Sequence, residues 1–195
     1  VGSRAFDSQT DITDIVLSDG ILYIEYSAFE NCKSLKNIKL PETLQSISRA
    51  MFKGCESLTE IRIPAATNFF YNDAFNDCDN LKSIDVDVNN KSLYSENGAL
   101  FNKDKTKLIK LCPGAGYENY TIPDGVQTVG TNAFYNCKSL KNVVMPDSVT
   151  EIGLGTFANC ENLISVNIPN GVKGIENGTF YACKNLEEIY IPDSV

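Results

Sequence analysis

The chain of 195 residues is long enough for one domain of ordinary size, and with 43% hydrophobic and 22% charged residues it is expected to form a globular fold. Its net charge of −8, with no run of Lys or Arg, argues against a nucleic-acid partner, and no apolar stretch approaches the ~20 residues of a membrane span. The sequence contains no histidine, which excludes Ser-His-Asp and Cys-His catalysis. We therefore expect no enzyme, no metal site and no cofactor.

A short motif recurs along the chain with a period of 23 residues. It can be aligned on seven phenylalanines, and only the interval from the fourth to the fifth is longer: Phe6, Phe29, Phe52, Phe75, Phe134, Phe157 and Phe180. Six of the seven cysteines keep the same step, and Cys112 falls outside it. One unit is too short to bury its own apolar side, so stacked units must share a continuous core. The repeat therefore predicts a solenoid.

Each unit contains three short pieces. In "LISVNIP" (163–169), Val166 and Ile168 alternate with polar residues, as in a half-buried strand that ends at a proline. A second extended piece follows at 172–175, and the spacing in "TFANC" (156–160) is typical of one helical or 3₁₀ turn. Three pieces per coil indicate a triangular or horseshoe cross-section.

The period of 23 lies in the range of leucine-rich repeats. We predict an α/β leucine-rich-repeat solenoid of about eight 23-residue coils, with a parallel strand sheet and short helical or 3₁₀ turns. Residues 1–195 are expected to form a single domain. Because the sequence begins without a leader pattern and stops inside the repeat at "IPDSV", we interpret it as a piece of a longer chain.

One coil, at 86–116, is a variant with 13 extra residues. The pattern predicts a protruding β-hairpin with arms at 99–101 and 107–111 and the polar turn "NKDKT" between them. This hairpin is expected to replace the "AFxxC" turn of its coil.

The repeated words "AFENCKSLKNIKLPETLQSIS" (28–48), "AFYNCKSLKNVVMPDSVTEIG" (133–153) and "TFANCENLISVNIPNGVKGIE" (156–176) resemble the BspA-type, or treponemal, leucine-rich repeat. The variant coil is similar to the "GxLxxKDxxxLxxxP" coil of that family. The resemblance covers nearly the whole chain. It implies a cell-surface or secreted protein of a host-associated microbe that acts in adhesion or binding, although a fold alone does not fix a function.

The cysteines recur at one position beside an inward phenylalanine, which favours a buried ladder of free thiols. Stacked strands lie about 4.8 Å apart, whereas a disulfide needs Cβ atoms about 3.8 Å apart. The acidic stretches 71–80 and 85–90 could suggest calcium, but their spacing is not that of an EF-hand and no glycine stands in mid-loop.

Two rows of side chains are expected on the solvent face of the strands. The first is polar throughout: Asp14, Asn37, Glu60, Ser83, Asn119, Asn142, Ser165 and Glu188. The second begins at Val16 and varies freely in size and charge, and it supplies the candidate binding residues: Lys39, Arg62, Asp85, Thr121, Val144, Asn167 and Tyr190. Either this face is solvated sheet, with Arg62 and Asp85 paired across strands, or it is a recognition surface.

We interpret the chain as a monomeric, non-enzymatic module that binds a protein or glycan partner through the strand face. The alternative is a stiff spacer that presents another domain. Carboxylates alone could form a glycosidase pair, but nothing in the sequence builds a deep pocket. A binding module is expected to concentrate exposed aromatic side chains on one face, and a spacer is not.

Overall fold

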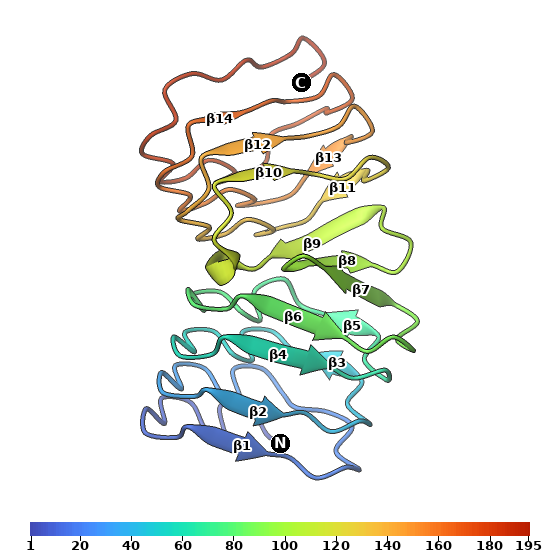
Figure 1. Ribbon diagram of the computed structural model, residues 1–195, viewed down its shortest axis with the longest axis vertical. Coiled ribbons are helices and arrows are strands. Elements are labelled where there is room, and N and C mark those ends of the chain that lie inside the picture. The colour runs from blue at the N-terminus through green and yellow to red at the C-terminus, as the bar shows by residue number, and fades with distance from the viewer.

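The computed structural model describes residues 1–195 as about seven stacked coils of about 23 residues (Figure 1). Most coils contribute one strand to a parallel array that is stacked along the long axis. Neighbouring strands pair with the predicted offset of 23 residues, as in Asp14 with Asn37 and Asn119 with Asn142. The predicted solenoid with a parallel sheet is confirmed. The strands of this face are β1 (Asp14–Val16), β2 (Asn37–Lys39), β4 (Glu60–Ile63), β6 (Ser83–Val86), β10 (Asn119–Thr121), β12 (Asn142–Val144) and β14 (Ser165–Val166).

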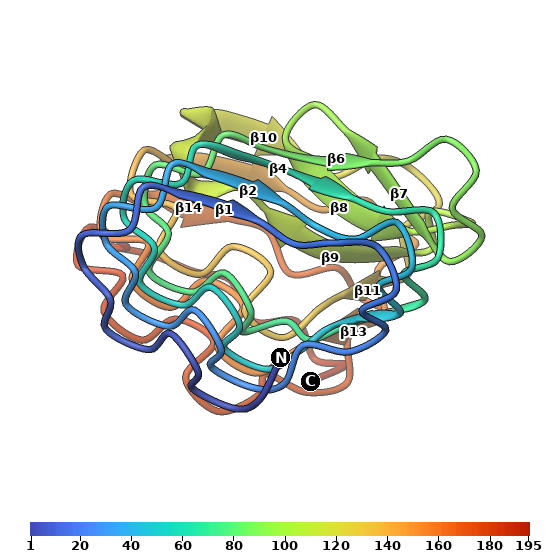
Figure 2. The same cartoon turned by 90° about the horizontal axis from the view of Figure 1, so that it is seen from below.

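A second side of each coil carries shorter strands, which Figure 2 shows opposite the repeated turns. A turn that starts at the strand-ending proline leads into it: the Leu44 N–H donates to the Pro41 carbonyl at 3.0 Å, and the same bond recurs in later coils. The two-residue strands of this side pair in parallel across one period. They are β3 (Ser46–Ile47), β5 (Phe69–Phe70), β11 (Thr128–Val129) and β13 (Glu151–Ile152).

The third side consists of tight turns rather than the expected helical or 3₁₀ turns. The cysteine N–H of each "AFxxC" motif donates to the phenylalanine carbonyl three residues earlier, at 3.0 Å for Cys55 and Phe52. The residue before the cysteine has a positive φ, 57° at Asn31 and 61° at Asn159, and this left-handed conformation stops a right-handed helix from continuing. The only helix is the 3₁₀ element η1 (Pro113–Ala115), inside the variant coil.

The phenylalanine rings stack along the axis of the solenoid in two runs. From Phe6 to Phe75 successive ring centroids lie 5.2–5.5 Å apart with interplanar angles of 9–16°. In the second run Phe157 is fully buried, 5.0 Å from Phe134 and 5.5 Å from Phe180. The predicted position of Phe157 between these two rings is confirmed.

The variant coil contains three antiparallel strands, β7 (Leu93–Glu96), β8 (Ala99–Asn102) and β9 (Lys107–Leu111), and β9 also pairs in parallel with β11. The expectation that the hairpin protrudes is wrong for its arms. Ala99–Phe101 and Leu108–Leu111 are buried, because all of these side chains except Lys110 are apolar and continue the core. Only the turn at 103–106 reaches solvent.

We call the stacked phenylalanines of the other coils the ladder phenylalanines. At the turn side of the variant coil, Leu111 occupies the place of one of them. Its N–H donates to the Ala133 carbonyl at 2.7 Å, and its carbonyl accepts from the Cys137 thiol at 3.8 Å. In this coil the short segment around η1 takes the place of the regular "AFxxC" turn. The flanking turns bond to each other instead: the Tyr135 hydroxyl donates to Asp77 at 3.2 Å, and the Lys138 ammonium donates to Asp79 at 2.7 Å.

Lys110 is fully buried at this irregular point of the stack. Its Nζ makes two hydrogen bonds, each at 3.5 Å, to the Asn76 side-chain oxygen and the Asn132 carbonyl. Burial lowers the pKa of this ammonium, although the Asp77 carboxylate favours its charged form. The amine is therefore a poorly satisfied polar group in the core.

Replacing Phe157 by alanine should lower the free energy of unfolding by about 3–5 kcal/mol, because the change opens a cavity between two stacked rings. Denaturant melts measure this loss. The control is Tyr181→Ala on the adjacent turn, where the side chain is 70% exposed and the expected change is within about 0.5 kcal/mol. A loss under about 1 kcal/mol for Phe157→Ala would contradict the buried ladder.

Replacing Lys110 by methionine should raise the free energy of unfolding at pH 7 by about 1–3 kcal/mol, since it removes a buried polar group with long hydrogen bonds. In the unfolded chain the lysine pKa is about 10.4. The unfolded state therefore binds more protons, and the native protein gains stability as pH rises from the lowered native pKa towards that value. The advantage of the variant should shrink between pH 7 and about pH 10.

Denaturant melts across that pH range test the prediction, with Lys107→Met on the same strand as the control. A stability difference that stays constant with pH would show that Lys110 is charged in the folded protein.

Candidate binding surface

All seven candidate residues of the second row are exposed on the strand face. The pairing register places Val16 beside Lys39, Arg62 beside Asp85, and Thr121 beside Val144. Lys39, Arg62 and Asp85 line one shallow depression of about 270 Å³, together with Asn37 and Glu60. The structure thus brings three of the candidates together.

Five of the eight side chains of the first row bond to one another along the stack. The Asn37 amide donates to Asp14 at 2.7 Å, the Asn142 amide donates to Asn119 at 2.6 Å, and the Ser165 hydroxyl donates to Asn142 at 2.8 Å. These side chains lie one coil apart and satisfy each other, so the first row stabilises the sheet. The second row is left as the more available part of this face.

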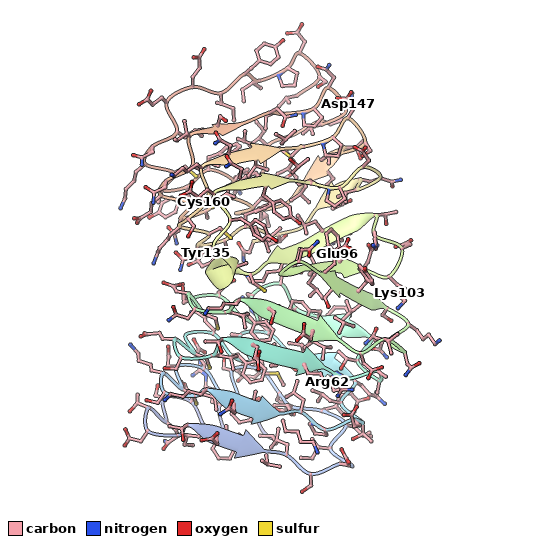
Figure 3. The ribbon with its side chains drawn as sticks, viewed as in Figure 1. Arg62, Glu96, Lys103, Tyr135, Asp147 and Cys160 are labelled. Atoms are coloured by element: carbon pink, nitrogen blue, oxygen red, sulfur yellow. The ribbon has the colours of Figure 1, made fainter.

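Arg62 makes two ion pairs, but the expected pair with Asp85 is wrong. Its guanidinium donates to Glu42 at 2.6 Å and to Asp87 at 2.5 Å, so Asp85 is its neighbour in register without being its partner. The hydrogen bond from Arg62 to Glu42 raises the pKa of Arg62, and the Asn89 N–H and Arg62 together lower the pKa of Asp87. Figure 3 shows Arg62 near the end of β4 where the chain turns away from the face.

The other four candidates lie in the C-terminal coils and are separated from these three, because β7 and β8 stand between β6 and β10 (Figure 1). Asn167 is exposed, but its side chain accepts from the Met145 N–H at 2.7 Å and donates to the Met145 carbonyl at 2.8 Å. It takes over backbone bonds of the neighbouring strand, so β14 ends at Val166. The eighth predicted strand, around Tyr190, does not form, and the Tyr190 side chain is 73% exposed.

The exposed aromatic side chains gather on another face, which the sequence interpretation missed. Tyr23, Tyr26, Phe69 and Tyr71 are all exposed on the second side of the coils and near its corner with the turns, and Phe69 and Tyr71 contact each other edge to face at 4.9 Å. On the strand face Tyr190 is the only aromatic candidate. Tyr26 and Tyr71 stand three and four positions before a stacked phenylalanine, and Tyr23 and Phe69 stand six before one. These positions vary from coil to coil as freely as the second row, and that variation could have pointed to them.

At that corner the surface is hollowed into a groove of about 710 Å³. Its lining includes Arg4, Tyr26, Arg49, Lys53, Tyr71 and Asp73. A second hollow of about 330 Å³ shares Arg49, Tyr71 and Asp73 and reaches Thr131 and Asn132. We call the two together the corner groove, which runs past the variant coil along the axis of the solenoid.

The thiols are placed where they are poor nucleophiles. Six of the seven cysteines are buried and Cys183 is half-buried, and none forms a disulfide. Burial raises the pKa of Cys78, Cys112 and Cys137 to about 12 and that of Cys183 to about 11. No cluster of three or more Cys, Asp or Glu side chains is arranged to hold a metal ion.

The stacked coils and their buried thiols define a leucine-rich-repeat solenoid. The sequence matches the family model described as BspA type leucine rich repeat region, with six copies over residues 1–114 and 112–195, and the chain belongs to this family. No curated protein sequence matches it. The structure has no helix with the length and apolarity that crossing a membrane requires.

Three solved bacterial structures have similar folds. The pneumococcal vaccine antigen PcpA has a TM-score of 0.83 and 28% identity over 88% of this chain and 43% of PcpA. A leucine rich cell surface protein from Faecalibacterium prausnitzii has a TM-score of 0.82 and 29% identity over 99% of this chain and 57% of its own. A leucine-rich repeat protein from Eubacterium ventriosum has a TM-score of 0.75 at 24% identity, over 97% of this chain and 62% of its own. This chain thus spans less than two thirds of each.

Under native conditions a thiol reagent should label Cys183 first and the six buried cysteines only after unfolding, because burial disfavours the reactive thiolate. Timed alkylation followed by peptide mass spectrometry measures the order. Disulfides between successive coils in the non-reduced protein, or fast labelling of Cys55 or Cys160, would contradict it.

Proposed function

We propose that this chain is a non-enzymatic, monomeric binding module of a cell-surface or secreted bacterial protein, and that it holds a protein or glycan partner on the strand face. Two structural relatives support this proposal, because one is a vaccine antigen and the other is described as a cell surface protein. Leucine-rich-repeat solenoids typically act as non-enzymatic binding surfaces, which supports the same proposal.

The observation that carries the proposal is the contrast between the two rows of the strand face. Most of the first row bonds to itself and the inward side chains are fixed by packing, whereas the second row presents different chemistry from coil to coil on a rigid sheet. Extended solenoid faces of this kind are suited to recognition.

Arg62 and Tyr190 are the proposed anchors, since arginine and tyrosine are enriched among the residues that dominate binding energy. The Glu42 and Asp87 carboxylates hold the Arg62 guanidinium in place, so little rotamer freedom is lost when a partner contacts it. Tyr190 offers a large, freely exposed ring.

One observation favours the spacer as a second candidate. Arg62 and Asn167 use much of their hydrogen-bonding capacity within the protein, and the face carries a single aromatic candidate. A stiff rod that presents other domains would need no more than that.

The double variant Arg62→Ala/Tyr190→Ala should weaken partner binding by about tenfold or more, as loss of interface anchors does. Pull-down from host extracellular protein and a glycan array, followed by titration of any partner found, measure this. The matched control is Lys33→Ala/Tyr181→Ala, which removes a cation and a tyrosine from exposed positions on the turn side. Equal binding by both double variants would contradict the strand face, and no partner for the unaltered protein would favour the spacer.

A further inference from the structure

The corner groove carries charges and aromatic rings that the repeat itself does not require. In the coil that contains Phe157, the positions equivalent to Tyr71 and Arg49 are Gly153 and Leu154. A Cβ at Gly153 would lie 2.5 Å from the Thr131 nitrogen, so the stack there leaves no space for a side chain. The tyrosines and cations of the groove are thus confined to the N-terminal coils.

Arg49 is held in position with its binding edge free. Asp73 accepts from Arg49 Nε at 3.1 Å and from the Ala50 N–H at 3.3 Å, which ties the guanidinium to the groove wall. The Arg49 side chain remains 75% exposed, and its two terminal nitrogens have no partner in the protein. A guanidinium with both terminal nitrogens free can bind a planar oxyanion such as a carboxylate.

Positive charge exceeds negative charge in the groove, on a protein whose net charge is −8. Arg4 has no ion-pair partner, and Lys53 pairs with Glu30 only at 3.4 Å. Arg49 and Lys53 are each matched by one carboxylate, so Arg4 leaves one cation in excess. The groove is therefore complementary to an anion.

Two tyrosine rings stand on either side of Arg49. Tyr26 and Tyr71 lie two coils apart, roughly 10 Å along the axis at the usual strand spacing, and Tyr71 is braced by its edge-to-face contact with Phe69. The face of an aromatic ring carries partial negative charge and packs well against the C–H bonds of a sugar ring. Apart from Ala50 the rest of the lining is polar, and it holds no apolar pocket for a peptide anchor.

We propose that the corner groove binds an acidic saccharide, with the sugar rings against Tyr26 and Tyr71 and a sugar carboxylate on the guanidinium of Arg49. Arg4 and Lys53 supply further attraction for neighbouring carboxylates. This site lies on a different side of the coils from the strand face and does not depend on the function proposed for that face.

Isothermal titration calorimetry with tetragalacturonate and with 3′-sialyllactose tests the proposal, each against its neutral counterpart, the galacturonate methyl ester and lactose. We expect at least one acidic ligand to bind, its neutral counterpart to bind about tenfold more weakly or not at all, and the affinity to fall with added salt. Arg49→Ala and Tyr71→Ala should each weaken binding by about tenfold, and Arg49→Lys should not restore it, because an ammonium cannot form the two parallel bonds.

Both side chains are exposed, so the melting temperature of each variant should be unchanged and a loss of binding can be assigned to the groove. The control is Lys33→Ala/Tyr181→Ala, which removes an exposed cation and an exposed tyrosine outside the groove and should bind the saccharide as the unaltered protein does. The proposal is overturned if neither acidic ligand binds, if both groove variants bind normally, or if a poly-glutamate peptide binds as well as the saccharides.

Discussion

The carbonyl of the ladder phenylalanine is the junction on which the stacking of the coils depends. The Phe29 carbonyl accepts the Cys32 N–H of its own turn at 3.3 Å and the Cys55 thiol of the next coil at 3.2 Å. One buried oxygen thus closes a turn and joins it to its neighbour, and the residue that serves it must be small, buried and able to donate. A cysteine thiol meets these needs, and the same role explains why the cysteines remain unpaired.

Where a leucine replaces the stacked phenylalanine, the rest of the stack rearranges around it. Leu111 keeps the carbonyl but not the ring, so the two runs of stacked phenylalanines are separated and the core divides into two clusters. The turns on either side close the gap through Asp77 and Asp79, and Lys110 is enclosed behind them. The shortened turn side of this coil is also what allows the corner groove to continue from Arg49 to Asn132.

Much of the fold could be predicted because the 23-residue period fixes register, strand pairing and the Phe157 environment together. Three features could not. The turn is not helical because Asn31 and its equivalents adopt a left-handed conformation. Asparagine tolerates this conformation, but its presence in a sequence does not predict it. The hairpin arms are buried because β9 joins the sheet of β11, a long-range pairing. Arg62 bonds to Glu42 and Asp87 rather than Asp85, because register fixes backbones and leaves a long side chain to choose among nearby carboxylates.

The strand face and the corner groove differ in which side chains the repeat allows to vary from coil to coil. On the strand face, alternation exposes every second residue whatever its identity, so variation there is permitted in all coils and is weak evidence by itself. At the corner groove, close packing of the coils removes the side chain at Gly153 but admits Tyr71, and Asp73 holds the exposed Arg49 guanidinium in one position through Nε. Side chains that are placed and oriented in only some coils of a regular stack are stronger evidence of selection for a ligand than free variation along an open row.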